Sequence, residues 1–202
     1  MDNRKIKFLS ILLIILLGII FSDNIINLLT NDKLQLETVV LYKGDYYVDK
    51  DIAAGTYDIE VISGNIIFNG KDMSVGDKII SNELEKKSFI SVDGDGSIMF
   101  SPSQPYKLSI NNGIYKIENS GFYSVGEHLA PGKYKLTIHS DEINFNPHVQ
   151  LLSKKNRDVI ETYDFADTNS LIISLDTSNI FEIHKELFKE IKNAYITLEL
   201  LE

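Results

Sequence analysis

Residues that could do chemistry are few in this sequence, and the most suggestive run is Asp93-Gly94-Asp95-Gly96-Ser97. A calcium-binding loop opens in this way and needs a bidentate acid at its twelfth position. Gln104 stands at that position, and it cannot supply two carboxylate oxygens. Asp-Gly is also a common dipeptide of tight hairpin turns. The run therefore predicts a turn, and we expect no metal site there.

The histidines show none of the spacings that hold a metal ion. No two lie four residues apart, and none has a glutamate at the spacing of a zinc protease. We expect each of them at the surface or in a turn. They are His128, His139, His148 and His184.

Signatures of covalent or phosphate chemistry are also missing. Cysteine is absent, which excludes disulfides, thiolate metal sites, cysteine nucleophiles and lipid attachment through cysteine. The sequence has no Gly-x-Ser-x-Gly, no phosphate-binding glycine loop and no Ser-x-x-Lys. A carboxylate pair of the glycosidase kind stays open, because strands can bring distant acids together. We expect no catalytic residue and no cofactor.

The charge of the chain argues against a polyanionic partner. Its 20 basic and 29 acidic residues give a net charge of −9. Such a surface repels phosphate backbones, so we expect no nucleic-acid partner. The basic run Lys154-Lys155-Asn156-Arg157 is too short to change this and is expected to be a loop.

The strongest pattern is an internal repeat, in which residues 44–57 align without a gap with residues 121–134. Seven of the fourteen positions match in kind, and we expect them to be structural rather than to form a ligand platform. The matching pairs are Gly44/Gly121, Tyr46/Tyr123, Val48/Val125, Ile52/Leu129, Ala53/Ala130, Gly55/Gly132 and Tyr57/Tyr134.

The repeated motif has the composition of a strand, a loop, a tight turn and a second strand. Ala130-Pro131-Gly132-Lys133 fits a type II turn, in which glycine accepts a positive φ at the third position. Ala53-Ala54-Gly55-Thr56 predicts the same turn without the proline. The residues that follow alternate between apolar and polar, so Tyr57 and Tyr134 are expected to point inward. The pairs Val48/Val125 and Ile52/Leu129 are expected to cover the same edge of the core.

The rest of the chain after residue 33 also reads as short strands separated by turn residues. This spacing predicts two related antiparallel β-sandwich or jelly-roll-like modules, at residues 34–112 and 113–202. The expected strands are 34–42, 56–62, 65–68, 88–92, 97–101, 106–110, 114–118, 133–139, 148–152 and 170–175.

The second module contains one pattern of helical spacing. Ile180, Ile183 and Leu187 predict a short helix near 179–192, with Ser178 available as its N-cap. An alternative stays open, because residues 89–100 look like a hairpin that closes the first module. Residues 188–198 would then be its counterpart, and the helix would end earlier.

The N-terminus, residues 1–33, predicts a membrane segment. Arg4, Lys5 and Lys7 precede a charge-free run at 8–22, and apolar character continues to residue 29. Residues 8–29 form either an uncleaved anchor or a signal peptide, although Ile20 and Ser22 make a poor cleavage site. In both cases the basic residues stay inside and the remainder is exported. Without residues 1–33, the chain has 16 basic and 26 acidic residues, a net charge of −10.

The repeated motif resembles the Gly-x-Tyr-x-Val-Gly-x-Asp-Ile-x-Ala-Gly-x-Tyr repeat of secreted or membrane-anchored proteins of Gram-positive bacteria. The first copy departs from it at Asp49, where glycine is usual, and at Ala54, where proline is frequent. The second copy keeps Gly126 and Pro131 but has His128-Leu129 in place of Asp-Ile. The resemblance implies an exported β-sandwich-like module without established catalytic residues.

Together these patterns predict a membrane-anchored cell-surface protein without enzymatic activity. It would be a single-pass protein with its C-terminal part outside the cell, or a secreted one if the segment is cleaved. Its modules would contact a cell-wall polymer, a glycan or another protein through exposed loops. The alternative is an exported hydrolase, such as a glycosidase, that uses two carboxylates.

Overall fold

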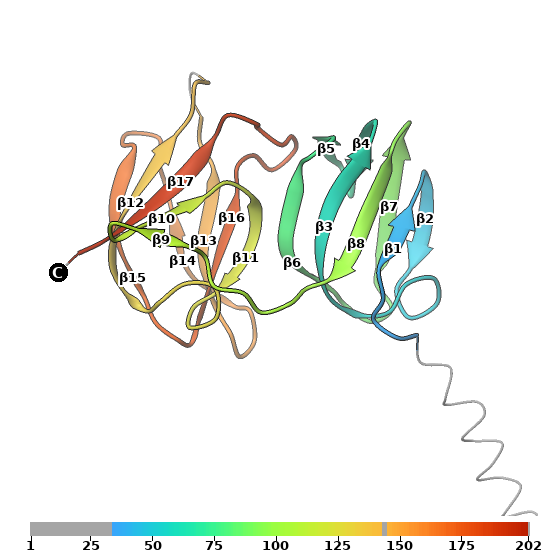
Figure 1. The fold of residues 1–202 in the computed structure, drawn as a ribbon, viewed down its shortest axis with the longest axis horizontal. Coiled ribbons are helices and arrows are strands. Elements are labelled where there is room, and N and C mark those ends of the chain that lie inside the picture. Colours follow the sequence, from blue (N-terminus) through green and yellow to red (C-terminus); the bar gives the residue numbers. More distant parts are fainter. Residues whose placement is uncertain (1–33, 143–144, 202) are drawn as a thin grey trace, which may run out of the picture. The chain divides into compact units, whose positions relative to one another are not determined.

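The computed structural model describes residues 34–142 and 145–201, which form strands and no helix (Figure 1). The prediction of a mainly β protein is therefore confirmed. The strands are β1 (Val39–Leu41), β2 (Gly44–Tyr47), β3 (Gly55–Ser63), β4 (Asn65–Phe68), β5 (Lys71–Ser74), β6 (Lys78–Leu84), β7 (Phe89–Gly94), β8 (Ser97–Pro102), β9 (Ile110–Asn111), β10 (Ile114–Ile117), β11 (Ser120–Ser124), β12 (Gly132–His139), β13 (His148–Ser153), β14 (Val159–Tyr163), β15 (Ser170–Leu175), β16 (Asn179–His184) and β17 (Tyr195–Leu200).

The predicted membrane segment at residues 8–29 lies outside the described residues. Within the described ranges, no helix has the length and apolar character needed to cross a membrane.

The predicted helix near 179–192 is wrong, because Asn179–His184 forms β16. Phe181 and Ile183 are buried while Glu182 and His184 are partly exposed, which is the period-2 pattern of a strand. β16 pairs with β11 on one side and with β13 on the other. These pairings supply the backbone hydrogen bonds and override the helical spacing of the isoleucines.

The two expected hairpins are wrong as well. β7 pairs with β2 and β4, whereas β8 pairs with β1 and β3, so these consecutive strands lie in different sheets. β17 likewise pairs with β10 and β12 and not with β16. Of the expected strand at 34–42, only Val39–Leu41 is extended in a sheet, and most of 106–110 is not a strand.

The pairing rule of the first eight strands is simple. β1 pairs with β8, β2 with β7, β3 with β6 and β4 with β5, all antiparallel. The strands form two sets, ordered β1-β8-β3-β6 and β2-β7-β4-β5. A ribbon of antiparallel pairs wound into two sheets in this order is a jelly roll.

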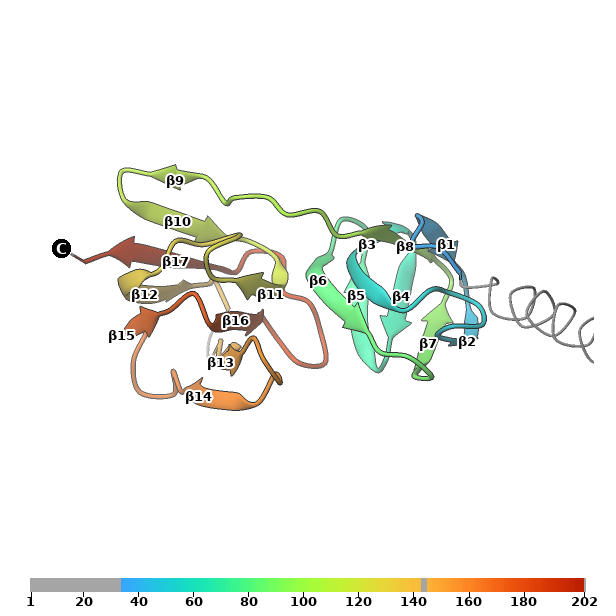
Figure 2. The same cartoon turned by 90° about the horizontal axis from the view of Figure 1, so that it is seen from below.

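The later strands repeat this order. β10 pairs with β17, β11 with β16, β12 with β15 and β13 with β14. Their sets are β10-β17-β12-β15 and β11-β16-β13-β14, and Figure 2 shows the extra strand β9 beside β10. Each set of eight strands encloses its own cluster of buried apolar side chains.

A parallel pairing joins the two jelly rolls into one eight-stranded sheet, in which β6 lies next to β11. Ser120 is opposite Ile79, and Gly121 is opposite Ile80. A Cβ atom on Gly121 would overlap the carbonyl oxygen of Ile80, so only glycine fits there. Ile80 itself packs into the core of the second jelly roll.

The predicted type II turns are not formed. Such a turn needs a φ near +80° at its third residue, but Gly55 has a φ of 154° and Gly132 is not in the left-handed region. The φ values near +80° lie earlier in the motif, at Asp49 (71°) and Gly126 (92°). The amides of these two residues donate to the carbonyl groups of Ile52 and Leu129. The tight loop of the motif therefore lies at residues 48–52 in the first copy and at residues 125–129 in the second.

The two valines of the motif lie at the base of this tight loop. Val48 and Val125 follow β2 and β11 without belonging to them, and their side chains are 3% and 0% exposed. Val125 forms an isolated bridge with Leu129, and its amide donates to the Asn179 carbonyl. Its own carbonyl accepts Nζ of Lys154 at 2.7 Å. Val125 is therefore a core residue, as predicted. Its side chain is not exposed to solvent and is not available to contact a ligand.

Each tyrosine of the motif forms a hydrogen bond of the same kind. Each hydroxyl group donates to the backbone carbonyl four residues earlier, at 2.7–3.0 Å. Burial raises the pKa of Tyr57, Tyr123 and Tyr134, which keeps these hydroxyl groups protonated as donors. Tyr57 and Tyr134 are fully buried, which agrees with the expected inward orientation. The hydrogen bonds run from Tyr46 to Tyr42, Tyr57 to Ala53, Tyr123 to Asn119 and Tyr134 to Ala130.

This arrangement predicts the effect of Tyr57→Phe. The substitution removes the hydroxyl group and leaves the buried Ala53 carbonyl without its partner, so it should lower the free energy of unfolding by about 1–3 kcal/mol. Urea unfolding followed by circular dichroism measures this change. The control is Tyr47→Phe, whose half-exposed side chain should tolerate the change within about 0.5 kcal/mol. Equal effects of the two substitutions would contradict the structural role of the motif.

Candidate functional site

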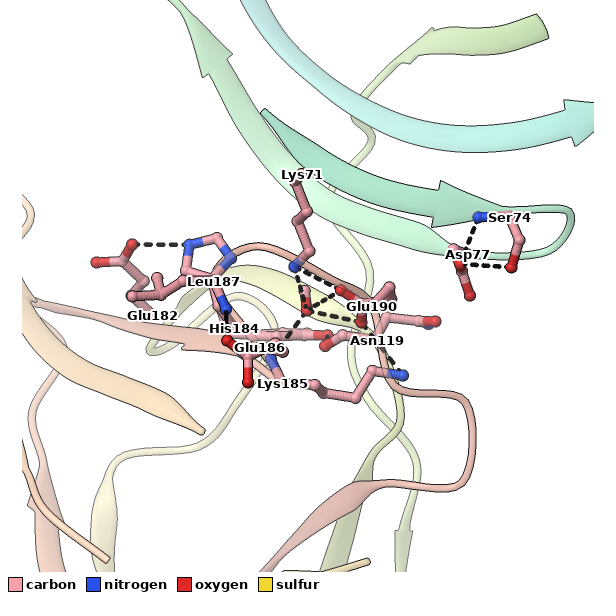
Figure 3. A network of polar contacts seen from close by, with 12 residues as sticks. Lys71, Ser74, Asp77, Asn119, Glu182, His184, Lys185, Glu186, Leu187 and Glu190 are labelled. Carbon is pink, nitrogen blue, oxygen red and sulfur yellow. Dashed lines mark hydrogen bonds and ion pairs between the residues drawn. The ribbon is translucent and has the colours of Figure 1, made fainter. Parts of the chain in front are cut away.

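A buried ionic cluster lies where residues from both jelly rolls meet (Figure 3). The side chain of Glu190 is only 1% exposed, and its carboxylate is 2.5 Å from Nζ of Lys71 and 3.2 Å from Nζ of Lys185. The Ser120 hydroxyl lies 2.8 and 2.9 Å from the two carboxylate oxygens. Ser120 also accepts the backbone amide of Lys185. Every charge in the cluster therefore has an opposite charge or a hydrogen-bond partner.

The segment that carries Glu190 also pairs with the edge of the first jelly roll. The amide of Asp72 donates to the Phe188 carbonyl at 2.8 Å, and the amide of Glu190 donates to the Asp72 carbonyl at 2.9 Å. Residues 188–190 thus cover β5, which is an edge strand of its sheet. Backbone pairing and the ionic cluster hold the same segment in place.

A cleft of about 700 Å³ lies beside this segment. Ile66 and Met73 form buried apolar parts of its lining, and lysines and aspartates supply charges of both signs. Asp77 accepts the amide and the hydroxyl group of Ser74. The residues that line the cleft are Lys43, Asn65, Ile66, Ile67, Asp72, Met73, Ser74, Asp77, Gly94, Asp95, Lys189 and Glu190.

The run Asp93-Gly94-Asp95 also borders this cleft and has structural contacts. The Asp93 carboxylate is 2.6 Å from Nζ of Lys43 and accepts the Gly94 amide. The Lys43 ammonium is the main cause that lowers the pKa of Asp93. Asp95 accepts the amide of Asn65. Among the described residues, no group of three histidines or acids is placed to hold a metal ion.

A second, smaller pocket of about 250 Å³ lies at the β6–β11 pairing. We call it the hydroxyl pocket, because four of its residues carry a hydroxyl group. It combines residues from both jelly rolls. They are Thr56, Ser81, Ser103, Pro105, Phe122, Ser124, Glu127, His128, Arg157 and Ile180.

Two side chains of the hydroxyl pocket are fixed by specific contacts. The Arg157 guanidinium lies 4.5 Å from the centre of the Phe122 ring and 2.9 Å from the Glu83 carboxylate. Nδ1 of His128 accepts the amide of Ser124, and burial lowers the pKa of this histidine. The ring is therefore neutral near pH 7 and carries its hydrogen on Nε2.

The other three histidines lie at the ends of strands β12, β13 and β16, and His148 is paired with His184. His139 stacks on Tyr195 with ring centres 4.5 Å apart. His184 lies 3.0 Å from the Glu182 carboxylate, and the rings of His148 and His184 are 6.1 Å apart.

The motif residues that we expect to be structural belong to the scaffold, and none of them lines the cleft or the hydroxyl pocket. Most are buried in the cores of the two jelly rolls, with Val125, Tyr57 and Tyr134 at 0% exposure, whereas Pro131 lies at the surface. The set placed in this way is Gly44, Tyr46, Val48, Ile52, Gly55, Tyr57, Gly121, Tyr123, Val125, Leu129, Pro131, Gly132 and Tyr134.

The motif positions that do line the hydroxyl pocket are those at which the two copies differ. Thr56 aligns with Lys133, Phe122 with Asp45 and Ser124 with Tyr47. Sequence reasoning missed both the ionic cluster and the hydroxyl pocket. The sequence signal that could have indicated these residues is that the aligned positions carry different residues in the two copies. Ser120 shows the same signal, because it aligns with Lys43.

Comparisons with protein-family models, with curated proteins and with solved structures gave no match to this chain.

The ionic cluster predicts a large effect of Glu190→Gln. The substitution leaves two buried lysines without their counter-charge and should lower the free energy of unfolding by about 3–5 kcal/mol. The control is Glu118→Gln in the exposed Lys116–Glu118 pair, which should change the free energy of unfolding little because solvent screens this pair. Urea unfolding of both variants gives the comparison, and a Glu190→Gln effect as small as that of the control would refute the role of the cluster.

Proposed function

We propose that the protein is a membrane-anchored cell-surface protein without enzymatic activity, whose two jelly-roll modules bind a component of the cell envelope. The anchor is residues 8–29, and the modules are residues 34–112 and 113–202. If a signal peptidase cleaves the segment, the same modules are secreted. The binding partner is a wall polymer, a glycan or another protein.

One observation carries the proposal: the two copies share the residues of the scaffold and differ at the motif positions that line the hydroxyl pocket. The tyrosine hydrogen bonds occur in both copies, so the repeated motif serves folding. A hollow lined by residues that vary between copies is typical of a binding scaffold, in which the frame stays constant and the loops carry recognition.

The contacts of the carboxylates also favour binding over catalysis. In the cleft, Asp77 accepts hydrogen bonds from Ser74 and Asp95 accepts the amide of Asn65. These are contacts that hold turns in place. Glu190 is neutralised by two lysines. These three acids are therefore occupied by structural partners.

A second candidate, an exported hydrolase, is favoured by the presence of Asp72, Asp77 and Asp95 in one cleft. A glycosidase needs two carboxyl groups about 5–10 Å apart across its substrate. Hydrolysis of wall glycan by the purified full chain that is lost in Asp72→Asn would establish this alternative and overturn the binding role.

The proposed location and role can be tested in intact Gram-positive cells. A tag at the C-terminus of the full chain should be removed by external protease, and the chain should cross-link to wall material. The variant Leu16→Arg/Leu17→Arg interrupts the charge-free run and should abolish both results. A tag that is protected in intact cells would contradict the location, and an exposed chain without any cross-linked partner would contradict the binding role.

A further inference from the structure

We infer that the hydroxyl pocket binds one neutral sugar unit. The biological setting of this sugar site rests on the proposed function. The pocket lies next to the β6–β11 pairing and is lined by residues from both jelly rolls.

Unused hydrogen-bonding groups line this pocket. The hydrogen bond of the His128 side chain uses Nδ1, and none of the side-chain hydrogen bonds within residues 34–142 and 145–201 involves its Nε2 or the hydroxyl groups of Thr56 and Ser124. Every fully buried side-chain nitrogen or oxygen of this part of the chain has a partner. The Nε2 of the buried His128 therefore reaches solvent, and we infer that it does so through the pocket that the residue lines.

Hydroxyl groups both donate and accept, and the Nε2–H group of His128 donates. A sugar presents several hydroxyl groups that both donate and accept. The free groups of the pocket match this pattern better than they match a ligand that only accepts, such as phosphate.

The charges of the pocket are already compensated. Arg157 pairs with Glu83 at 2.9 Å, and Glu127 lies 3.4 Å from Nζ of Lys154. A charged ligand would therefore meet no unpaired opposite charge on Arg157 or Glu127. The net charge of −10 outside residues 1–33 also repels anionic polymers. An uncharged ligand has neither cost.

The apolar part of the pocket suits the C–H surface of a sugar ring. Phe122, Ile180 and Pro105 supply this surface beside the hydroxyl groups. A mixture of a few placed polar groups with apolar and aromatic walls is typical of small-molecule sites.

The backbone of the pocket is strained at two positions. Ser81 has a φ of 52° and Arg157 has a φ of 57°, values that are uncommon outside glycine, asparagine and aspartate. At Ser81 the β3–β6 pairing changes register. The Ser81 amide bonds to Asp58, and its hydroxyl group lies 3.0 Å from that of Ser103. Bulges and strained residues held by such contacts concentrate at functional sites.

Binding should be tested with the full chain in a detergent that has no sugar headgroup. The probes are four sugars with a similar ring, namely glucose, N-acetylglucosamine, glucuronate and glucosamine. Titrations followed by NMR should show the two neutral sugars binding with a Kd of about 1 mM, as expected for so small a ligand. The acidic and basic sugars should bind about tenfold more weakly, because they meet compensated charges.

Two variants locate the site. Thr56→Val/Ser124→Ala removes two unpartnered hydroxyl groups and should weaken neutral-sugar binding about tenfold. The control Thr162→Val removes a hydroxyl group on β14, outside the pocket, and should leave the Kd unchanged. Unchanged binding in the double variant, stronger binding of a charged sugar, or no binding of any neutral sugar at about 10 mM would each overturn the inference.

The outcome separates this inference from the proposed function. Cross-linking to the wall that persists in the Thr56→Val/Ser124→Ala variant, without neutral-sugar binding, would leave the envelope role and remove the pocket as its site. Neutral-sugar binding through the pocket in a chain that never reaches the cell surface would support the pocket and refute the envelope role.

Discussion

The arrangement of the whole described chain depends on one buried carboxylate, that of Glu190. Removing a carboxylate and two ammonium groups from water costs several kcal/mol for each ion, and only complete pairing offsets this cost. Lys71, Lys185 and Ser120 provide that pairing, and they come from strands or segments of both jelly rolls. Because the cluster is satisfied only when these segments meet, it favours the parallel β6–β11 pairing next to it and the backbone contact between β5 and residues 188–190. The hydroxyl pocket, which needs both jelly rolls, depends on this joint in turn.

The joint connects two similar jelly rolls through different edges, which is a head-to-tail contact. Such contacts can continue into open chains of molecules. The edges that correspond to β6 and β11 in the other jelly roll are β15 and β2. These two edges lack the groups that form the joint. Lys43 stands where the second copy has Ser120, so the serine of the cluster is missing. The β7–β8 connection is also too short to carry a counterpart of residues 185–194. A charged lysine beside an edge strand also discourages pairing with another chain. The two jelly rolls therefore form one joint within the chain, whereas the equivalent edges β15 and β2 lack the groups that would form the same joint with another molecule.

Local signals in the sequence predict part of this structure well. The strands at 65–68 and 170–175 have the predicted bounds, and the repeated motif marks the tight loop, the buried valines and the inward tyrosines. The helix near 179–192 was a wrong prediction, because isoleucines at helical spacing also fit a strand once β11 and β13 flank it. Gly132 was predicted to occupy a type II turn, whereas the φ near +80° that such a turn needs is found at Gly126. The ionic cluster combines residues that lie up to 119 positions apart, between Lys71 and Glu190, and none belongs to a local pattern. Only the tertiary pairing of strands brings them together.

This joint makes the two jelly rolls one cooperative unit. Hydrogen exchange of backbone amides measures the free energy at which each part opens. We expect the protected amides at the β6–β11 pairing, around Ile80 and Gly121, to exchange only through global unfolding. Their free energy of opening should equal that of the core strands β3 and β12. Opening of these amides at a free energy several kcal/mol lower, while β3 and β12 stay protected, would show that the jelly rolls separate readily and are not one cooperative unit.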